Sequence, residues 1–292
     1  MRVAAETLFI ATTPGLEQVL LAEARSLGEA KVVRGGVRLT GPAGVHRLAN
    51  LRLRCASRVW LETAKRRLDT SGELLYRRGY RQEVSRAPLR ETLAAGLLRL
   101  ARHQPTEPLW DPLCGSGTLA IEAALMSRGI AAGLSRSFAF EQFPTYDPVA
   151  YEREKAALRS SQLPVVQAPI WASDLNAGAL GTARRNAARA GVAGDLKLFR
   201  SDATQRATQP VTDLPAGALV ISNLPYGKRA GAGSDLPALY RAVVGAVRRS
   251  GAARAGFLTA DPRAPDWLGL KNTETTPVEN GGLKCLFVVG EL

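Results

Sequence analysis

The sequence predicts an α/β protein in which a small α+β domain precedes a mostly parallel sheet that helices cover on both faces. Three observations lead to this prediction. The chain has 292 residues, enough for one large domain or two smaller ones. Its first 65 residues read as short elements in the order β-α-β-β-α-β, which is the ferredoxin-like arrangement. From about residue 108 onward, apolar strands alternate with helices.

The elements of the first part follow from turn residues and apolar spacing. Pro14 is suited to the first turn of a helix, and Gly28 is suited to end it. Gly35 and Gly36 predict a β-hairpin, because glycine supplies the positive φ of a tight turn. The predicted elements are strands at 7–11, 31–34, 37–40 and 58–62 and helices at 14–28 and 42–51.

The second part alternates strand and helix after a turn at 69–72. Strands are predicted at 74–76 and near 108–111, 169–173, 195–200, 217–222, 254–260 and 284–290, and helices near 89–101, 117–128, 148–160, 176–191 and 236–250. An insertion at 129–168 holds aromatic residues, for which packing over the sheet is favoured over contact with a substrate. We expect a domain at 1–67, a basic linker at 68–87 and a second domain at 88–292.

Positive charge is concentrated in the middle of the chain. The net charge is +13, and residues 47–102 alone carry 14 basic and 5 acidic side chains, an excess of 9. Most of these basic residues are arginines, whose planar guanidinium pairs with phosphate and stacks on bases. A basic stripe of this kind is typical of nucleic-acid binders. The alternative is an ordinary solvated face in a protein rich in arginine.

Several classes of protein are excluded by composition. No stretch approaches the roughly 18 apolar residues that a membrane span requires. The N-terminal Met1–Glu6 reaches an acidic residue before an apolar region can form, so we expect no signal peptide. Three separated cysteines without a CxxC pair, and only two histidines, argue against a disulfide framework and a metal site. We therefore expect a cytoplasmic protein that binds no metal and no membrane.

A glycine loop follows the strand that ends at Asp111. Gly115 and Gly117 allow the backbone to approach a ligand where a Cβ would collide. The loop has no lysine after its glycines, so it is not a P-loop, and its spacing is not that of dinucleotide sites. An acid at the strand end suits a ligand with an ammonium group, as in S-adenosylmethionine, and the place is the first crevice of a doubly wound sheet. The alternative is an ordinary strand-to-helix turn.

Two further acidic residues end the next two predicted strands. Asp174 is placed to accept hydrogen bonds from the ribose hydroxyls of an adenosine. Asp202 is placed to accept one from the adenine amino group. For each acid alone, capping a helix N-terminus is an equally good explanation, but three acids in succession at strand ends favour a cofactor site.

The residues Asn223, Leu224, Pro225 and Tyr226 follow a buried strand at the rim of the same crevice. The Asn223 Oδ1 and the Leu224 carbonyl can accept both N–H groups of an exocyclic amine, which is otherwise a poor nucleophile. Pro225 fixes φ and makes the turn rigid, and Tyr226 offers a face on which a base can stack. The alternative is a common Asn-Pro type of turn. With the glycine loop, this segment predicts methyl transfer to an amino group.

Three pairs of stretches carry a family resemblance: 111–118 with 223–229, 78–81 with 87–94, and the opening 12–17 with 35–37. Together they resemble the THUMP-associated RNA guanine-N2 methyltransferases, which include 23S rRNA and tRNA enzymes. The resemblance implies S-adenosylmethionine as cofactor, and a Rossmann-like class I methyltransferase domain with a seven-stranded sheet after a ferredoxin-like domain. It implies a cofactor site at Asp111, Pro112, Cys114, Gly115, Ser116, Gly117, Thr118, Asp174, Leu175, Asp202, Ala203 and Asn223. It implies a target-amine site at Asn223, Leu224, Pro225 and Tyr226.

The sequence departs from this family at two places. The family has a THUMP domain between the ferredoxin-like part and the segment 78–81, whereas residues 68–87 resemble only a remnant of it. Members that modify rRNA usually carry proline at the position of Leu224. A leucine there is more similar to some tRNA-modifying members. We hypothesise that basic side chains compensate for the missing domain by binding RNA, namely Arg66, Arg67, Arg77, Arg78, Arg81, Lys228 and Arg229.

The predicted reaction is an in-line displacement in which a guanine N2 attacks the sulfonium methyl group while Asn223 and the Leu224 carbonyl hold its protons. The target base has to leave its stack to reach the crevice. Cys114 has no neighbour in sequence that would activate a thiolate, so we do not assign it as a nucleophile. The alternatives are a methyltransferase for DNA adenine or protein glutamine, and a non-catalytic RNA-binding protein on the same fold.

Overall fold

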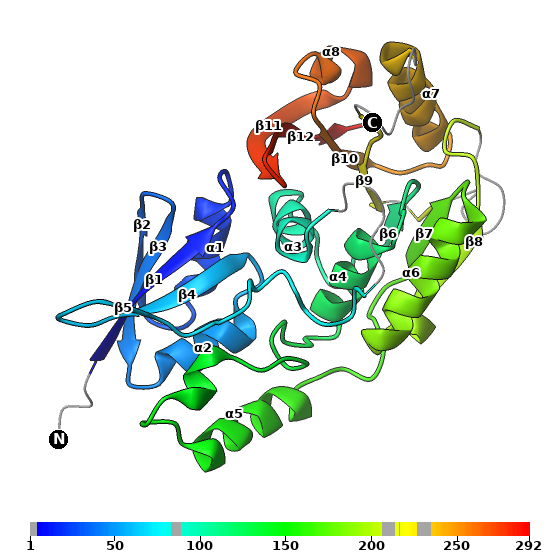
Figure 1. The fold of residues 1–292 in the computed structure, drawn as a ribbon. Coiled ribbons are helices and arrows are strands. Elements are labelled where there is room, and N and C mark those ends of the chain that lie inside the picture. The colour runs from blue at the N-terminus through cyan, green and yellow to red at the C-terminus, as the bar shows by residue number, and fades with distance from the viewer. Residues whose placement is uncertain (1–4, 83–88, 206–213, 216, 227–234) are drawn as a thin grey trace.

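Two β-sheets lie side by side in the computed structural model, the N-terminal one at the left of Figure 1 and the C-terminal one at the right. The structure describes residues 5–82, 89–205, 214–215, 217–226 and 235–292. Within these residues, no helix is both long and apolar enough to span a bilayer.

The first sheet has the strand order β2-β3-β1-β4-β5. Its strands are β1 (Ala5–Thr12), β2 (Glu29–Val33), β3 (Gly36–Pro42), β4 (Ala56–Glu62) and β5 (Arg67–Asp69), and its helices are α1 (Glu17–Ala24) and α2 (Val45–Arg52). This order confirms the predicted ferredoxin-like domain, with β5 added at one edge. The two hairpin glycines serve different purposes. Gly35 has a φ of +81°, whereas a Cβ on Gly36 would lie 1.9 Å from the carbonyl oxygen of Ile10 on β1.

One predicted strand in the connection between the domains is wrong. Residues 74–76 form no strand, with Leu75 and Tyr76 in a turn, and the extra strand is β5, which pairs with the end of β4. Leu75 is buried, and its amide donates a single hydrogen bond of 3.0 Å to Ser57, so the apolar residues of this segment fill a gap without joining the sheet. The short, charged β5 carries no apolar pattern that could have predicted it.

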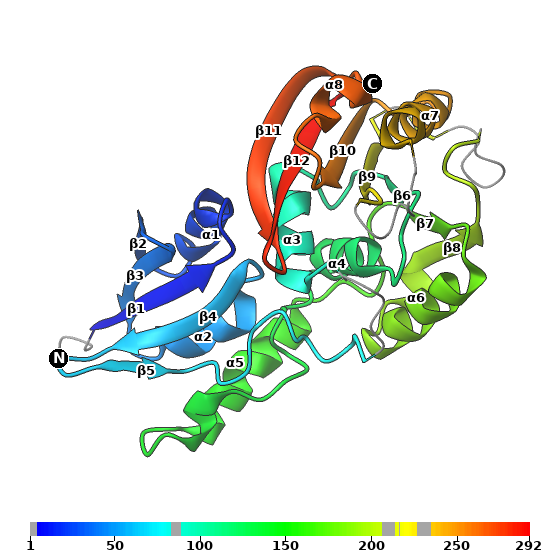
Figure 2. The same ribbon diagram turned by 45° about the horizontal axis from the view of Figure 1, so that its top comes forward.

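Both helices of the first domain cover the face of its sheet that is turned to the C-terminal domain (Figures 1 and 2). Helix α1 contacts β2 and β3, and α2 contacts β4 and β1. Helix α1 also contacts α3 (Glu91–Leu100), the first helix of the second domain. The opposite face of the five-stranded sheet carries no helix from the described part of the chain.

The second sheet has the order β11-β12-β10-β9-β6-β7-β8, with five parallel strands followed by an antiparallel pair at one edge. Its strands are β6 (Leu109–Asp111), β7 (Ile170–Asp174), β8 (Leu196–Arg200), β9 (Leu219–Asn223), β10 (Arg254–Thr259), β11 (Lys271–Asn280) and β12 (Leu283–Glu291). The helices α3, α4 (Thr118–Ser127) and α6 (Ala177–Arg189) pack on one face, and α7 (Leu236–Arg248) and α8 (Ala264–Leu268) pack on the other. Short 3₁₀ turns lie at Ala139–Gln142 and Ala193–Asp195. The predicted α/β fold with a seven-stranded sheet is confirmed.

The insertion packs on the first domain rather than over the second sheet. Its aromatic residues Phe138, Phe140 and Tyr151 belong to the same hydrophobic core as α1 and α2. The ring of Phe140 lies 5.3 Å from that of His46 on α2. An ion pair of 2.7 Å joins Arg47 to Glu154 of α5 (Pro148–Ser160). The segment therefore holds the two domains together, and packing of its aromatics was predicted correctly but on the wrong partner.

Candidate active site

The glycine loop and the Asn223 turn leave neighbouring strands at the same edge of the sheet. Strand β6 lies between β9 and β7, where the chain order of the sheet reverses. The Ser222 hydroxyl on β9 donates a hydrogen bond of 2.6 Å to the Asp111 Oδ1 at the end of β6. The two segments therefore lie side by side as predicted, and such a reversal point is where ligands bind in sheets of this kind.

The two glycines of the loop are required for different reasons. Gly115 and Gly117 both have positive φ, of 53° and 82°. A Cβ on Gly115 would meet no atom within 4 Å, so this glycine faces open space. A Cβ on Gly117 would lie 3.0 Å from the Cβ of Ala183, so this glycine allows α6 to pack against the loop. The room for a ligand is therefore beside Gly115.

Hydrogen bonds fix the loop on its neighbours. The Cys114 amide donates to the carbonyl of Ser173 at 2.9 Å, and the Asn186 side chain of α6 donates to the carbonyl of Ser116 at 3.2 Å. Ser116 and Thr118 are buried, with their hydroxyl oxygens 3.4 Å apart. Burial raises the pKa of the Cys114 thiol well above its usual value, which agrees with its not being a nucleophile.

Asp111 is a buried carboxylate without a cationic partner among the described residues. Burial raises the pKa of its carboxyl to about 7, against the opposing effects of the Ser222 hydroxyl and the Leu113 amide. The nearby Asp174 carboxylate adds to the increase. A positively charged group would remove this penalty, so the position is suited to a ligand that carries a cation.

The other two acidic residues already hold backbone amides. Asp174 accepts hydrogen bonds of 2.9 Å from Gly115 and from Asn176, so it joins the glycine loop to the start of α6. Asn176, not Asp174, caps this helix. Asp202 accepts hydrogen bonds from the amide and hydroxyl of Thr204, and the hydroxyl lowers the pKa of this carboxyl. Leu175 is 54% exposed, whereas Ala203 is buried.

Asn223 presents a polar atom that the described protein does not satisfy. Its Oδ1 is buried and accepts no hydrogen bond from any described residue. A buried acceptor without a partner is costly, and a donor group on a ligand would remove that cost. The turn around it is held firmly, since the Leu224 amide donates to Leu258 at 3.0 Å and the Tyr240 hydroxyl donates to Pro225 at 3.0 Å.

Tyr226 does not offer the open stacking face that the sequence predicted. Its ring is 5% exposed and belongs to the hydrophobic core, and its hydroxyl accepts a hydrogen bond of 3.1 Å from Asn280. The ring is covered because β11 and β12 bring Asn280 and Cys285 against it. Ser222 and Tyr240 were also missed from the sequence, although a serine within the apolar strand Leu219–Asn223 was a usable signal.

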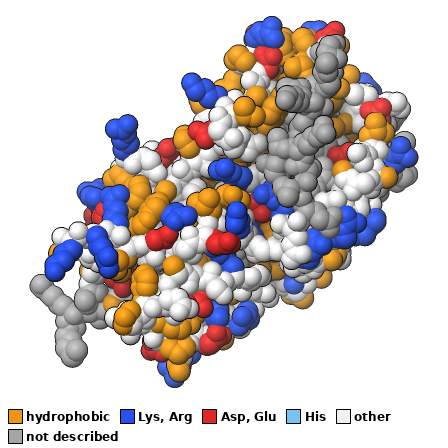
Figure 3. Space-filling model, in the orientation of Figure 1, with side chains coloured by type: hydrophobic (Ala, Val, Ile, Leu, Met, Phe, Trp, Pro, Cys, Tyr) orange, Lys and Arg blue, Asp and Glu red, His pale blue; other side chains and the backbone are white. Residues whose placement is uncertain are grey.

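The prediction that Arg78 and Arg81 bind RNA is wrong, because both side chains are buried in ion pairs. The Arg78 Nε lies 3.0 Å from the Glu122 Oε1 and Arg81 lies 3.1 Å from Glu91, with side chains only 3% and 8% exposed. The exposed candidates are Arg66, Arg67 and Arg77. Lys228 and Arg229 lie outside the described residues. Figure 3 shows that basic side chains on the visible face are spread out and interspersed with acidic ones.

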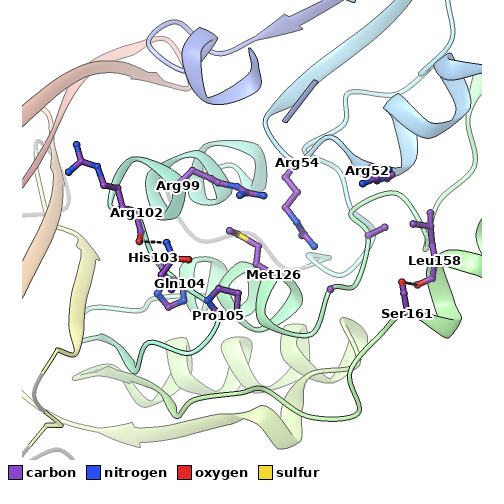
Figure 4. Close-up of a pocket in the computed structure, with 12 residues that line it drawn as sticks. Arg52, Arg54, Arg99, Arg102, His103, Gln104, Pro105, Met126, Leu158 and Ser161 are labelled. Atoms are coloured by element: carbon purple, nitrogen blue, oxygen red, sulfur yellow. Dashed lines mark hydrogen bonds between the residues drawn. The ribbon is translucent and has the colours of Figure 1, made fainter. Parts of the chain in front are cut away.

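A pocket of about 530 Å³ lies at the opposite edge of the second sheet, where α3 ends and β6 begins (Figure 4). Arg99 from α3 and Arg54 from the first domain point into it. A second pocket of about 670 Å³ lies on the active-site edge and includes Asn280, the partner of Tyr226. In the described part of the chain, no cluster of side chains is suited to hold a metal ion.

The fold and the arrangement at β6 and β9 are those of a methyltransferase, and the chain belongs to the family described as the RMKL-like methyltransferase domain, which residues 78–288 match. Residues 7–60 match the RlmL ferredoxin-like domain. "Putative RNA methyltransferase slr0064" of Synechocystis is 35% identical, over 77% of this chain and 58% of that protein. "Ribosomal RNA large subunit methyltransferase K/L" of Chromohalobacter salexigens is 37% identical, over 75% of this chain and 31% of that protein.

The chain thus spans 58% and 31% of the lengths of these two relatives. A solved structure with the same fold is that of SMU.472, "a putative methyltransferase complexed with SAH". It superposes with a TM-score of 0.87 at 23% identity, over 98% of both chains. At that identity, the likeness shows the shared fold.

Proposed function

We propose that the protein is an S-adenosylmethionine-dependent RNA methyltransferase that forms N2-methylguanosine in rRNA or tRNA. The observation that carries the proposal is the buried, unsatisfied Asn223 Oδ1 on a rigid turn beside the Gly115 loop. RNA as the class of substrate is supported by the names of the relatives, which describe RNA methyltransferases.

The crevice fits S-adenosylmethionine on three counts. There is open space at Gly115 for a ligand, and the buried Asp111 carboxylate is suited to an ammonium group. Asp174 follows on the adjacent strand, and the backbone bond from Ser201 to its carbonyl keeps Asp202 beside it. When bound, this cofactor supplies an electrophilic methyl group on a sulfonium.

The protein's own part in the reaction is to orient the amine. Asn223 Oδ1 and the Leu224 carbonyl accept the two N–H groups of the guanine N2, which directs the nitrogen lone pair into the crevice. The hydrogen bonds of Leu224 and Pro225 to β10 and α7 keep the two acceptors in fixed positions. With the cofactor bound, the new N–C bond would form as the bond between the methyl carbon and sulfur breaks, and the nitrogen would lose one proton to water.

The test is methyl transfer with tritium-labelled S-adenosylmethionine to separated tRNA and rRNA, followed by digestion to nucleosides. We expect the label to enter RNA and to co-elute with N2-methylguanosine. Single-stranded DNA and a glutamine-containing peptide are included as competing substrates. Label in N6-methyladenosine of DNA, in the peptide or in none of these substrates would refute the proposal.

The affinity for S-adenosylmethionine is expected to rise with pH and to level off above about pH 7. The Asp111 carboxyl has a raised pKa of about 7 in the free protein and must be ionised to pair with an ammonium, so binding releases its proton below that pH. Calorimetry should show about ten-fold tighter binding for each pH unit between about pH 5 and 7.

Asp111→Asn should weaken the binding of S-adenosylmethionine and remove this dependence on pH. Asp202→Asn should keep the slope, because the pKa of Asp202 is already below its usual value. Equal slopes in wild type and Asp111→Asn would contradict the assignment.

The exposed arginines are proposed as RNA contacts in place of the buried ones. Replacing Arg66, Arg67 and Arg77 together with glutamine should reduce the slope of log K against log salt for RNA binding by about 2. A triple variant of the exposed Arg52, Arg102 and Arg159 makes the same change in net charge and serves as control. A reduction of equal size in both variants would mean that only net charge matters.

A further inference from the structure

The helix-free face of the N-terminal sheet carries two stacked aromatic rings. Phe9 on β1 and Trp60 on β4 are direct cross-strand partners. Their ring centroids are 5.5 Å apart with an angle of 27° between the planes. Their side chains lie on the face opposite Leu8, Ile10 and Val59, which are buried under α1 and α2. Both rings are only half-buried, and neither belongs to a hydrophobic core of the described residues.

Arginine side chains lie over both rings. The guanidinium carbon of Arg67 on β5 is 4.3 Å from the centroid of Phe9, and that of Arg58 on β4 is 5.8 Å from the centroid of Trp60. A guanidinium plane and an aromatic ring are the two surfaces on which proteins stack unpaired bases. The four side chains therefore form a continuous stacking surface across three neighbouring strands.

The surroundings of the rings are basic. Strand register places Lys31, Arg38, Phe9, Trp60 and Asp69 in one row across all five strands. The cations on this face and in the hairpin turns that border it are Lys31, Arg34, Arg38, Arg58, Lys65, Arg66 and Arg67, and the acids are Glu29, Glu62 and Asp69. Seven cations against three acids leave an excess of four positive charges. Figure 3 shows basic side chains along this N-terminal part of the molecule, at the left of the view.

We infer that this face binds unpaired nucleotides of the RNA substrate, with bases stacked on this surface of rings and guanidinium groups and phosphates held by the surrounding arginines and lysines. The inference rests on the proposed function and deepens it, because residues 68–87 supply no large separate domain to hold RNA. A protein partner is disfavoured, since charged residues are depleted at the centre of protein–protein interfaces and here they surround the rings. Stacking also tolerates any base, so this surface adds affinity without fixing the target sequence.

The test is fluorescence anisotropy with the full chain and a fluorescein-labelled single-stranded oligoribonucleotide of about ten nucleotides. Phe9→Leu and Trp60→Leu keep an apolar side chain and remove a ring, and each should weaken binding by about 5- to 100-fold. Trp60→Phe keeps a ring and should retain most of the affinity. The control is Trp267→Leu, since Trp267 is another half-buried tryptophan with an arginine, Arg263, 4.8 Å over its ring. The control should bind within about two-fold of wild type, and thermal unfolding verifies that each variant is folded.

Wild-type affinity in Phe9→Leu and Trp60→Leu would overturn the inference, as would an equal loss in Trp267→Leu. Failure of the proposed function gives a different result. If the protein binds the oligoribonucleotide through these rings but methylates no RNA, the surface stands and the proposed activity falls. If it methylates RNA while the ring variants bind normally, the activity stands and the surface falls.

Discussion

Replacing Asn223 with alanine is expected to lower the turnover number for RNA methylation by about a hundred- to a thousand-fold. The affinity for S-adenosylmethionine should stay nearly unchanged. The reason is that the Asn223 Oδ1 is buried and has no described partner in the free protein, so its hydrogen-bonding capacity is available to the amine. Alanine removes the acceptor that orients the nitrogen. It also removes a buried unsatisfied atom, so the free energy of unfolding should fall little or even increase.

Asn176 provides a matched control for this prediction. It follows strand β7, which lies on the other side of β6 from β9, but its Oδ1 accepts hydrogen bonds from the amides of Gly178 and Ala179 and caps α6. Asn176→Ala should therefore lose about 1 kcal/mol of stability and keep its turnover number at saturating cofactor. Single-turnover kinetics, calorimetry and urea unfolding measure the three quantities. A loss of activity in Asn223→Ala that is matched by a loss of stability would assign Asn223 a structural role.

Replacing Glu122 with glutamine is expected to lower the free energy of unfolding by about 3–5 kcal/mol. Glu122 is fully buried, and its carboxylate lies 3.0 Å from Arg78 and 3.7 Å from Arg54. The hydroxyl of Tyr80 donates to the same carboxylate at 3.1 Å. Glutamine keeps the shape but removes the charge, which leaves two buried guanidinium groups without a counter-ion. The ion pair also joins the segment between the domains to α4, so its loss should affect the whole molecule.

Urea unfolding followed by circular dichroism measures this effect. The control is Glu73→Gln, which removes the partner of Arg77 in an ion pair with side chains 66% and 59% exposed. Exposed pairs contribute about 0.2–1 kcal/mol, so the control should stay close to wild type. A loss below about 1 kcal/mol in Glu122→Gln would show that the buried arginines are solvated or held by other groups. If the large loss is found, weaker RNA binding in Arg78→Ala must be attributed to unfolding.

Secondary structure was predictable wherever an element buries one apolar face. The five parallel strands and the helices α3, α4, α6 and α7 were recognised from such runs, whereas the short α8 was missed. Strand β11 was missed because its residues Lys271–Asn280 are mostly exposed and polar, and it is an edge strand paired only with β12. The strand predicted at 74–76 failed for the converse reason, since a few apolar residues can be buried in a connection without pairing.

The candidate site was predictable in its main outline because the polar residues stand at strand ends. Parallel strands bring their carboxyl ends to one edge, so the order of elements was enough to place Asp111 near Asn223. The environment of each side chain was not predictable. Burial under β11 and β12 covers Tyr226, and hydrogen bonds to the loop occupy Asp174. These contacts come from segments distant in the chain.

The sequence by itself determined the α/β fold, the glycine loop and the turn that carries Asn223. The reason is that turn formation and apolar periodicity depend on residues that are close together in the chain. Only the tertiary structure decided which arginines are available to RNA. Arg77 and Arg78 are adjacent in the chain, yet one is exposed and the other is buried against Glu122, 44 residues away. Packing between distant segments decides which charged side chains form ion pairs, so a local sequence pattern cannot predict these pairs.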